Sequence, residues 1–461
     1  MYKIYLDRVN FFIIIIAMVA ALGGFTLGFD AGFVIDGKDQ ITALFNLSDF
    51  QWSFVACVSI LGSLVAILVS GIFADKFGSK NLLLFTALGF ILGLILAANA
   101  HTLPQLIIGR FIIGICIGIA SYSSPLFISE ISPPATRGGM ILLNGIAITA
   151  GQAISFLAGY FLHDLSIDSW RFILGIEIIP AVLLFIGMIF MPQSPRWIAK
   201  RHGIELARLT LKRVRLNDSV EKELNEIQQS ISSNSHKISF KELFSKKMFP
   251  VLIVGTSLGV LQQLIGISAI MYYGPVVFHA VGFDSVKSGI FATFGIGLIN
   301  LFFTIVSAFL IDYLGRRFLL LSGTLIAAVS MFLLGSVCLG KISDQWGLLF
   351  VATYIIGYCI SLGSLFWVLI SEIFPTNIRG MAMSFATAMQ CAANFLVSIT
   401  FLEFFDYLGK SDTFFLYGLM SIVAFIFVYY VIPETKGVSL EVIEANLNAG
   451  KKIRKLGAPL L

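Results

Sequence analysis

The chain has 461 residues, of which 57% are hydrophobic and only 12% carry a charge. A soluble globular protein carries about 25% charged residues, so this composition excludes a water-soluble enzyme. The apolar residues form long unbroken runs rather than short alternating segments, which argues against a transmembrane β-barrel.

Twelve apolar segments are long enough to cross about 30 Å of hydrocarbon as helices. In chain order they cover residues 11–35, 52–73, 81–99, 104–126, 139–162, 172–191, 249–277, 289–311, 318–339, 347–370, 380–402 and 413–432. Only helices satisfy their backbone groups internally in lipid, so we predict an all-α membrane protein with twelve transmembrane helices. The first segment is too long for a signal-peptide core and is expected to remain as a span.

Basic residues are concentrated on one side of these segments. The N-terminus, the loops after even-numbered segments and the tail contain 25 of the 31 Lys and Arg residues. Because basic loops stay in the cytoplasm, we predict a multi-pass protein of the plasma or bacterial inner membrane with both termini cytoplasmic. This asymmetry accounts for the net charge of +5, and no nucleic-acid partner is expected.

The chain contains an internal repeat. Residues 129–138 (SEISPPATRG) recur as 371–380 (SEIFPTNIRG), and residues 192–196 after the sixth segment match 433–437 after the twelfth. Parallel repeats of this kind place the substrate site near the membrane midplane, between the halves. The predicted domains are an N-terminal six-helix half (1–191), a cytoplasmic helical linker (192–248), a C-terminal six-helix half (249–432) and a cytoplasmic tail (433–461).

Motifs along the whole chain resemble those of the sugar porter family of the major facilitator superfamily. They are Gly28–Asp30, Gly109–Arg110, Glu130–Arg137, Pro192–Arg196, Gln262–Ile267, Asp312–Arg317, Trp367–Glu372 and Pro433–Gly437. Within the family the chain resembles the bacterial xylose and glucose–proton symporters, and residues 361–380 look like those of the xylose symporters. The resemblance implies the major facilitator fold, with two pseudo-symmetric six-helix halves. It also implies import of a monosaccharide, a hexose or a pentose, in symport with protons by alternating access.

Several positions depart from the family pattern. Gly145 stands where many members have a sugar-contacting Gln, and Ser268 replaces the usual Asn. Either Gly145 leaves space in the pocket, or it lets its helix pack closely on a neighbour. The other departures are expected to affect gating, and they are Ser364 for Pro, Ser79-Lys80 for an Arg pair and Gln193 for Glu.

Three charged residues, Asp30, Arg110 and Glu177, lie inside apolar segments, where each charge costs roughly 2.5–3.5 kcal/mol. All three lie about 8–9 Å from the outer surface, and this common depth predicts one cluster. Two carboxylates then share one guanidinium, so the acids titrate as a coupled unit. A proton can enter from the outer side and leave when the cluster rearranges. In the resembled symporters the matching residues form the proton-coupling site; the alternative is a static ion triad that holds the helices together.

Polar side chains, most of them amides, recur at mid-depth. They lie about 15–21 Å from the starts of their spans, near the membrane centre. An amide offers both a donor and an acceptor to a neutral polyol, and most of these positions match sugar-contact positions of the family. The predicted substrate-binding residues are Gln152, Gln262, Gln263, Ser268, Asn300, Trp367, Gln390 and Asn394. The alternative for any single amide is a hydrogen bond that holds two helices together.

Two groups of residues are predicted to gate access. Tyr272 and Tyr273 precede a Gly-Pro pair that either forms a hinge over the substrate or is a plain kink. The charged motif residues on the cytoplasmic side are predicted to form a latch between the halves, or else they only set topology. They are Asp75, Glu130, Arg137, Arg196, Asp312, Arg316, Arg317, Glu372, Arg379 and Glu434.

No cofactor, metal or catalytic residue is expected. The five cysteines (Cys57, Cys116, Cys338, Cys359 and Cys391) lie in or beside apolar runs without a CxxC pair, so we interpret them as packing residues. The expected partners are a monosaccharide, protons and the lipid bilayer, and the protein is expected to be a monomer. Alternative functions are an uncoupled sugar or polyol facilitator, which Asp30 argues against, a non-transporting sugar sensor, which usually carries a longer tail, and efflux.

Overall fold

The computed structural model describes residues 11–133, 137–163, 168–215, 220–233, 240–246, 248–375, 378–438 and 440–458. Across these residues the secondary structure is helical, without a strand. Twelve helical segments are long and apolar enough to cross a membrane, one for each predicted span. The predicted all-α fold with twelve membrane helices is therefore confirmed.

The first six spans are built from seven helices. Each span has a linker end, on the side from which the chain enters residues 192–248, and an opposite, remote end. The first span divides into two helices at Asp30. The helices are α2 (Phe11–Phe29), α3 (Ala31–Phe45), α4 (Asp49–Phe77), α5 (Ser79–Ala98), α6 (Leu103–Ile131), α7 (Arg137–Leu162) and α8 (Ser169–Phe190).

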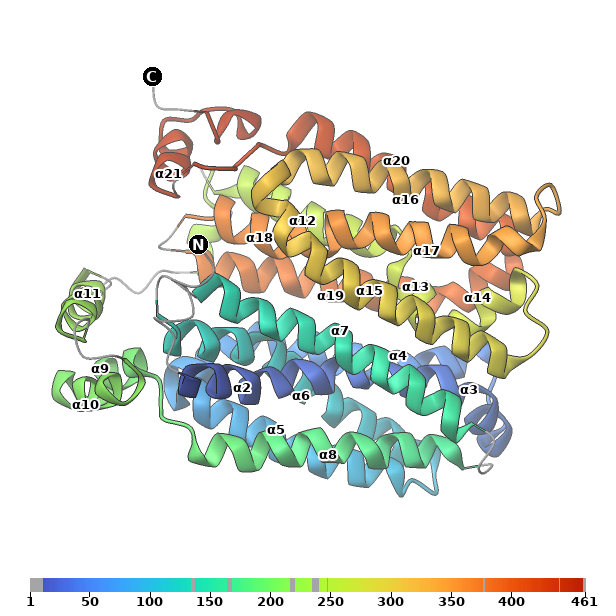
Figure 1. Cartoon of the computed structure of the whole chain (residues 1–461), viewed down its shortest axis with the longest axis horizontal. Helices are drawn as coiled ribbons and strands as arrows, with labels where there is room; N and C mark the ends of the chain where they lie inside the picture. The colour runs from blue at the N-terminus through green and yellow to red at the C-terminus, as the bar shows by residue number, and fades with distance from the viewer. Residues whose placement is uncertain are drawn as a thin grey trace. The chain divides into compact units, whose positions relative to one another are not determined.

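The linker forms three short α-helices and one 3₁₀ turn. They are α9 (Pro195–His202), α10 (Ile204–Val214), α11 (Val220–Ser233) and η2 (Phe240–Phe244). Figure 1 shows α9, α10 and α11 grouped beyond the linker end of α8. They share a small apolar core that includes Ala207, Leu211 and Leu224. The predicted cytoplasmic helices of the linker therefore pack as a small helical cluster.

The last six spans contain two interrupted helices. The elements are α12 (Phe249–Leu264), α13 (Ile267–Tyr272), α14 (Gly274–Ala280), α15 (Val286–Leu314), α16 (Arg316–Cys338), η3 (Asp344–Trp346), α17 (Gly347–Tyr358), η4 (Cys359–Gly363), α18 (Ser364–Ile373), α19 (Arg379–Tyr407) and α20 (Lys410–Val431). The tail adds α21 (Leu440–Asn448) and η5 (Ile453–Lys455).

The seventh span breaks twice, between α12 and α13 and again at Tyr273. At the first break Gly266 has φ +92°, a left-handed conformation that a residue with a Cβ adopts only under strain. The carbonyl of Ile265 accepts a hydrogen bond from the Tyr354 hydroxyl of α17 at 2.9 Å. A freed backbone group at membrane depth needs such an internal partner, which explains how the break is tolerated.

The tenth span is interrupted at η4, a π-helical turn between α17 and α18. Within it Ser361 has non-helical angles, φ −116° and ψ −110°. Such π-turns expose backbone carbonyls to side chains and frequently lie at functional sites. The sequence did not predict this interruption.

The helices divide into two compact units. The first contains residues 1–30, 62–151 and 174–238, and the second contains 31–61, 152–173 and 239–461. The second unit therefore includes α3 and the remote ends of α4, α7 and α8 together with the last six spans. The predicted boundaries at 191, 248 and 432 remain a prediction.

Within the second unit, the remote end of α7 packs on α15. Gly297 of α15 lies against Phe156 and Ala153 of α7. The Tyr160 and Phe291 rings lie 5.1 Å apart, and Lys287 lies 5.2 Å from the Tyr160 ring. These contacts close the remote end of α7 against α15.

Candidate functional site

The first unit contains a buried ion pair between two spanning helices. Arg110 of α6 pairs with Asp30, which lies at the junction of α2 and α3. The Arg110 side chain is fully buried and that of Asp30 is 9% exposed. Desolvating two charges is costly and is compensated only by close pairing, so the two side chains must stay in contact for their burial to be tolerated.

Glu177 of α8 lies beside this pair. The side chain is completely buried, and it interacts electrostatically with both Asp30 and Arg110. Within the part of the chain that the structure describes, neither carboxylate oxygen of Glu177 has a hydrogen-bond partner. The structure thus brings all three predicted residues together, with one guanidinium for two carboxylates. Their role in proton coupling remains a prediction.

The predicted sugar-binding amides all lie in the second unit, and two of them form a chain on η4. The Gln262 amide nitrogen donates to the Leu362 carbonyl at 2.9 Å and to the Tyr358 hydroxyl at 3.3 Å. The Gln262 amide oxygen accepts from the Gln390 amide nitrogen at 2.9 Å. Both ends of Gln262 are thus engaged by protein, and Gln390 is held in place by Gln262.

A second amide pair joins α7, α15 and η4. The Asn300 amide nitrogen donates to the Gln152 amide oxygen at 3.1 Å. The Asn300 amide oxygen accepts from the Cys359 thiol at 3.1 Å and is 3.5 Å from the Thr304 hydroxyl. Cys359 is therefore more than the packing residue predicted from the sequence.

The remaining predicted sugar contacts lie in smaller groups. Ser268 donates to the Gln263 amide oxygen at 2.7 Å across the first break of the seventh span. Asn394 of α19 accepts from the Ser398 hydroxyl at 3.1 Å. Trp367 of α18 packs edge-on against Phe366 and is 43% exposed. Ser268 and Gln263 are buried, whereas Asn394 and Trp367 are partly exposed; their contact with sugar remains a prediction.

Gly145 faces open space. A Cβ placed on this residue meets no atom within 4 Å, which favours the open-space alternative over close packing. Gln152 lies two turns farther along α7 on a similar face, because seven residues span nearly two full turns. The missing side chain of Gly145 therefore belongs to the same face of α7 as Gln152.

Gly145→Gln is expected to change the ranking among sugars without lowering thermal stability. The new side chain enters open space, and replacing a mid-helix Gly removes a cost of about 1 kcal/mol. The measurements are competitive sugar uptake and thermal unfolding in detergent. Gly151→Ala is the matched control on the same helix. There a Cβ meets the Phe25 carbonyl, so stability should fall; a fall of the same size for Gly145→Gln would contradict the open-space assignment.

The predicted gating tyrosines lie at the second break of the seventh span. Tyr273 is 2% exposed, its hydroxyl donates to the Ser398 carbonyl at 3.0 Å, and its ring stacks on Phe401 at 5.1 Å. Tyr272, the last residue of α13, is partly buried. The Tyr273 side chain is therefore fixed against α19 in this structure rather than free to close over the predicted sugar site.

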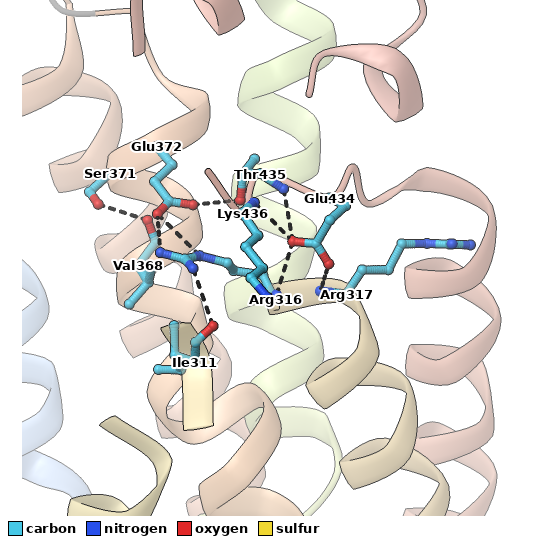
Figure 2. Close-up of polar contacts among 9 residues, drawn as sticks. All are labelled: Ile311, Arg316, Arg317, Val368, Ser371, Glu372, Glu434, Thr435 and Lys436. Carbon is cyan, nitrogen blue, oxygen red and sulfur yellow. Dashed lines mark hydrogen bonds and ion pairs between the residues drawn. The ribbon is translucent and has the colours of Figure 1, made fainter. Parts of the chain in front are cut away.

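The motif charges of the second half form a network at the linker end. Arg316 pairs with Glu372 of α18 at 2.9 Å, and Thr435 donates to the other Glu372 oxygen at 2.6 Å. Figure 2 shows the Glu434 carboxylate between these groups and the start of α16, where it accepts from the backbone nitrogens of Arg316 and Arg317. A carboxylate at a helix N-terminus is favourable, because unpaired N–H groups and the helix dipole meet there.

The equivalent network of the first half carries less charge. Ser79 stands at the position of Arg316 and donates to Glu130 at 2.6 Å, so a hydroxyl takes the place of the guanidinium. Gln193 stands at the position of Glu434, and its side-chain oxygen accepts from the Ser194 backbone nitrogen at 3.3 Å. Asp75 pairs with Lys200 of α9 on the surface at 2.9 Å. Both departures therefore remove a charge from the same cluster.

The other predicted latch residues are placed as follows. Arg379 donates to the Phe374 carbonyl at 3.2 Å, Arg196 is exposed and interacts electrostatically with Glu130, and Arg137 begins α7. The side chain of Asp312 lies outside the described part of the structure. Each of these pairs joins two residues of the same unit. A latch between the halves therefore remains a prediction.

Comparison with known proteins assigns the family. The family model described as "Sugar (and other) transporter" matches residues 16–447. The chain belongs to this family of sugar transporters. It is therefore a multi-pass membrane transporter and not an enzyme, and its resemblance to the sugar porters is confirmed.

Individual relatives match along nearly the whole chain. The galactose-proton symporter of Escherichia coli K12 is 34% identical over 452 residues, covering 96% of both chains. A D-xylose transporter of Levilactobacillus brevis is 33% identical over 439 residues, covering 93% of this chain and 94% of the relative. The inward-open structure of the xylose transporter XylE from E. coli has a TM-score of 0.82 at 29% identity, covering 94% of this chain and 99% of that one.

Sequence reasoning about this transporter missed the residues of the π-turn. Tyr358, Cys359 and the Leu362 carbonyl hold the predicted sugar amides, yet none was proposed for the site. A signal was present, because a Tyr inside an apolar span needs a partner for its hydroxyl, and one glycine, Gly357, precedes the turn while another, Gly363, ends it.

Proposed function

We propose that this transporter imports a monosaccharide in symport with protons across the cell membrane by alternating access. The observation that carries the proposal is the buried cluster of Asp30, Arg110 and Glu177. A membrane-buried cluster with two acids and one base can hold or release a proton with little rearrangement, whereas a neutral facilitator has no need of it. A relative named as a galactose-proton symporter points to the same chemistry, and one named as a D-xylose transporter points to the same class of substrate.

The substrate is proposed to bind at the amides of the second unit. Neutral amides and hydroxyls suit a neutral polyol, because each hydroxyl both donates and accepts. Gln152, Gln263, Gln390 and Asn394 each have a hydrogen-bonding group that is not used in the contacts described above, whereas Gln262 and Asn300 act as supports. We further propose that both termini are cytoplasmic, in line with the basic linker, and that the protein works as a monomer.

Uptake by purified protein in proteoliposomes tests this function. An imposed gradient, acidic outside, should drive labelled D-galactose, D-glucose, D-xylose or L-arabinose above its external concentration, and a protonophore should abolish the accumulation. Equilibration without accumulation would favour the uncoupled facilitator. Binding without any exchange of label would favour the sensor.

A further inference from the structure

The two amide chains on η4 have a direction that follows from the groups at their starting points. A backbone carbonyl can only accept a hydrogen bond. Since Gln262 lies 2.9 Å from the Leu362 carbonyl, its nitrogen must face Leu362 and its oxygen must face Gln390. Gln390 then donates to Gln262 and directs its own oxygen away from the pair. This chain ends in an acceptor.

The second chain begins at a side chain and has the opposite direction. The Cys359 thiol donates to the amide oxygen of Asn300, which lies 3.1 Å from its sulfur. The Asn300 nitrogen consequently faces the Gln152 oxygen. Among the described residues only the Gln152 oxygen is engaged, so its nitrogen is available and this chain ends in a donor.

The Cys359 thiol is placed to act in this way. It is 1% exposed and Asn300 is 8% exposed, so water does not compete for the contact. In a buried site the hydrogen bond is stronger than in solvent. Without the thiol, the Asn300 and Gln152 amides can turn together and exchange donor for acceptor, because an amide has similar shape in both orientations. The Thr304 hydroxyl at 3.5 Å is too distant to replace the thiol fully.

We propose that Cys359 is a positioning residue that sets the hydrogen-bond polarity of the sugar pocket, by obliging Gln152 to present a donor while Gln390 presents an acceptor. The inference rests on the proposed function, since it assumes that these amides meet a sugar. Cys359 then contributes to sugar specificity. One hydroxyl of the bound sugar accepts a hydrogen bond from Gln152, and another hydroxyl donates one to Gln390.

Analogues that can only accept or only donate test this polarity. The probes are D-galactose, D-glucose or D-xylose, whichever binds, with each hydroxyl replaced in turn by fluorine, which only accepts, or by an ammonium group, which only donates. In the wild type one position should favour fluorine and another should favour ammonium. In Cys359→Ala the preference for fluorine should shrink about 5-fold, the equivalent of one hydrogen bond. The preference for ammonium should stay unchanged, because the Leu362 carbonyl still orients Gln262 and, through it, Gln390.

Two further variants separate positioning from general damage. Cys359→Ser keeps a donor at the same place and should restore the preference for fluorine. Cys116→Ala removes another buried thiol, in α6, and should change neither preference. Preferences that do not move in Cys359→Ala, that shift equally at both positions, or that Cys359→Ser fails to restore would overturn the proposal.

The hydrogen bond of the Cys359 thiol can also be measured without any sugar. The infrared S–H stretching band of Cys359, assigned by difference from Cys359→Ala, should lie at the lower wavenumber of a hydrogen-bonded thiol. A band at the position of a free thiol overturns the polarity-setting role, whatever binds. If the band is shifted but no monosaccharide binds the wild type, the proposed function falls while the contact stands.

Discussion

Asp30→Asn is expected to abolish proton-driven accumulation of sugar while exchange of sugar across the membrane continues. An Asn can still accept a hydrogen bond from Arg110, and Glu177 remains to balance the guanidinium charge. The variant should therefore fold, but the amide cannot take up a proton, so the gradient no longer couples to sugar movement. The measurement is uptake by proteoliposomes under an imposed pH gradient, alongside counterflow without a gradient.

Asp39→Asn is the matched control, because Asp39 lies on α3 and is exposed. It should leave both accumulation and exchange unchanged. Full accumulation by Asp30→Asn would show that the cluster is a static ion triad, and the proton would then have to couple elsewhere. Loss of exchange together with accumulation would mean that Asp30 is needed for the conformational cycle itself.

Arg215→Met is expected to weaken the attachment of the linker by about 3–5 kcal/mol, the usual cost of breaking one side of a buried ion pair. The Arg215 side chain is 3% exposed and that of its partner Glu223 is 11% exposed. Two of its nitrogens lie 2.7 and 2.8 Å from the Glu223 carboxylate, and a third donates to the Ile131 carbonyl at the end of α6. Removing it leaves a buried carboxylate and a helix terminus without their donor.

Limited proteolysis and thermal unfolding in detergent measure this effect, with the linker expected to be cleaved faster. Arg208→Met is the control, since Arg208 pairs with Glu205 and Glu221 at the surface, where such pairs contribute about 0–1 kcal/mol. Arg215→Met combined with Glu223→Leu should recover most of the loss, because apolar side chains can replace a buried pair. Equal losses in Arg215→Met and Arg208→Met would show that burial of the pair is unimportant.

The spans and the buried charges were predictable because each rests on a strong physical constraint. An apolar run of about 20 residues has few alternatives to a membrane helix. A charge within such a run must find a partner, and equal depth on three helices is sufficient to predict which ones meet. Asp30, Arg110 and Glu177 accordingly lie together.

The breaks and the contacts of single polar side chains were not predictable in the same way. The hydropathy of a span is the same whether its helix is continuous or interrupted. The hydropathy pattern therefore gave no sign of the left-handed Gly266 or of the π-turn at 359–363. Cys359 was interpreted from composition as a packing residue, because a thiol contributes to hydropathy and not to any motif. Its direction toward Asn300 depends on the local register of the turn, which only the folded backbone determines.

The uneven charge of the two repeated networks has a mechanical consequence. In the second half, charged contacts connect α16 with α18 and with the segment after α20. They are made by Arg316 with Glu372 and Glu434. In the first half the Ser79 hydroxyl takes the place of the Arg316 guanidinium at the α5–α6 junction, and the surface pair of Asp75 with Lys200 adds little stability. During the conformational cycle, the linker end of the second half should therefore deform less than the linker end of the first half.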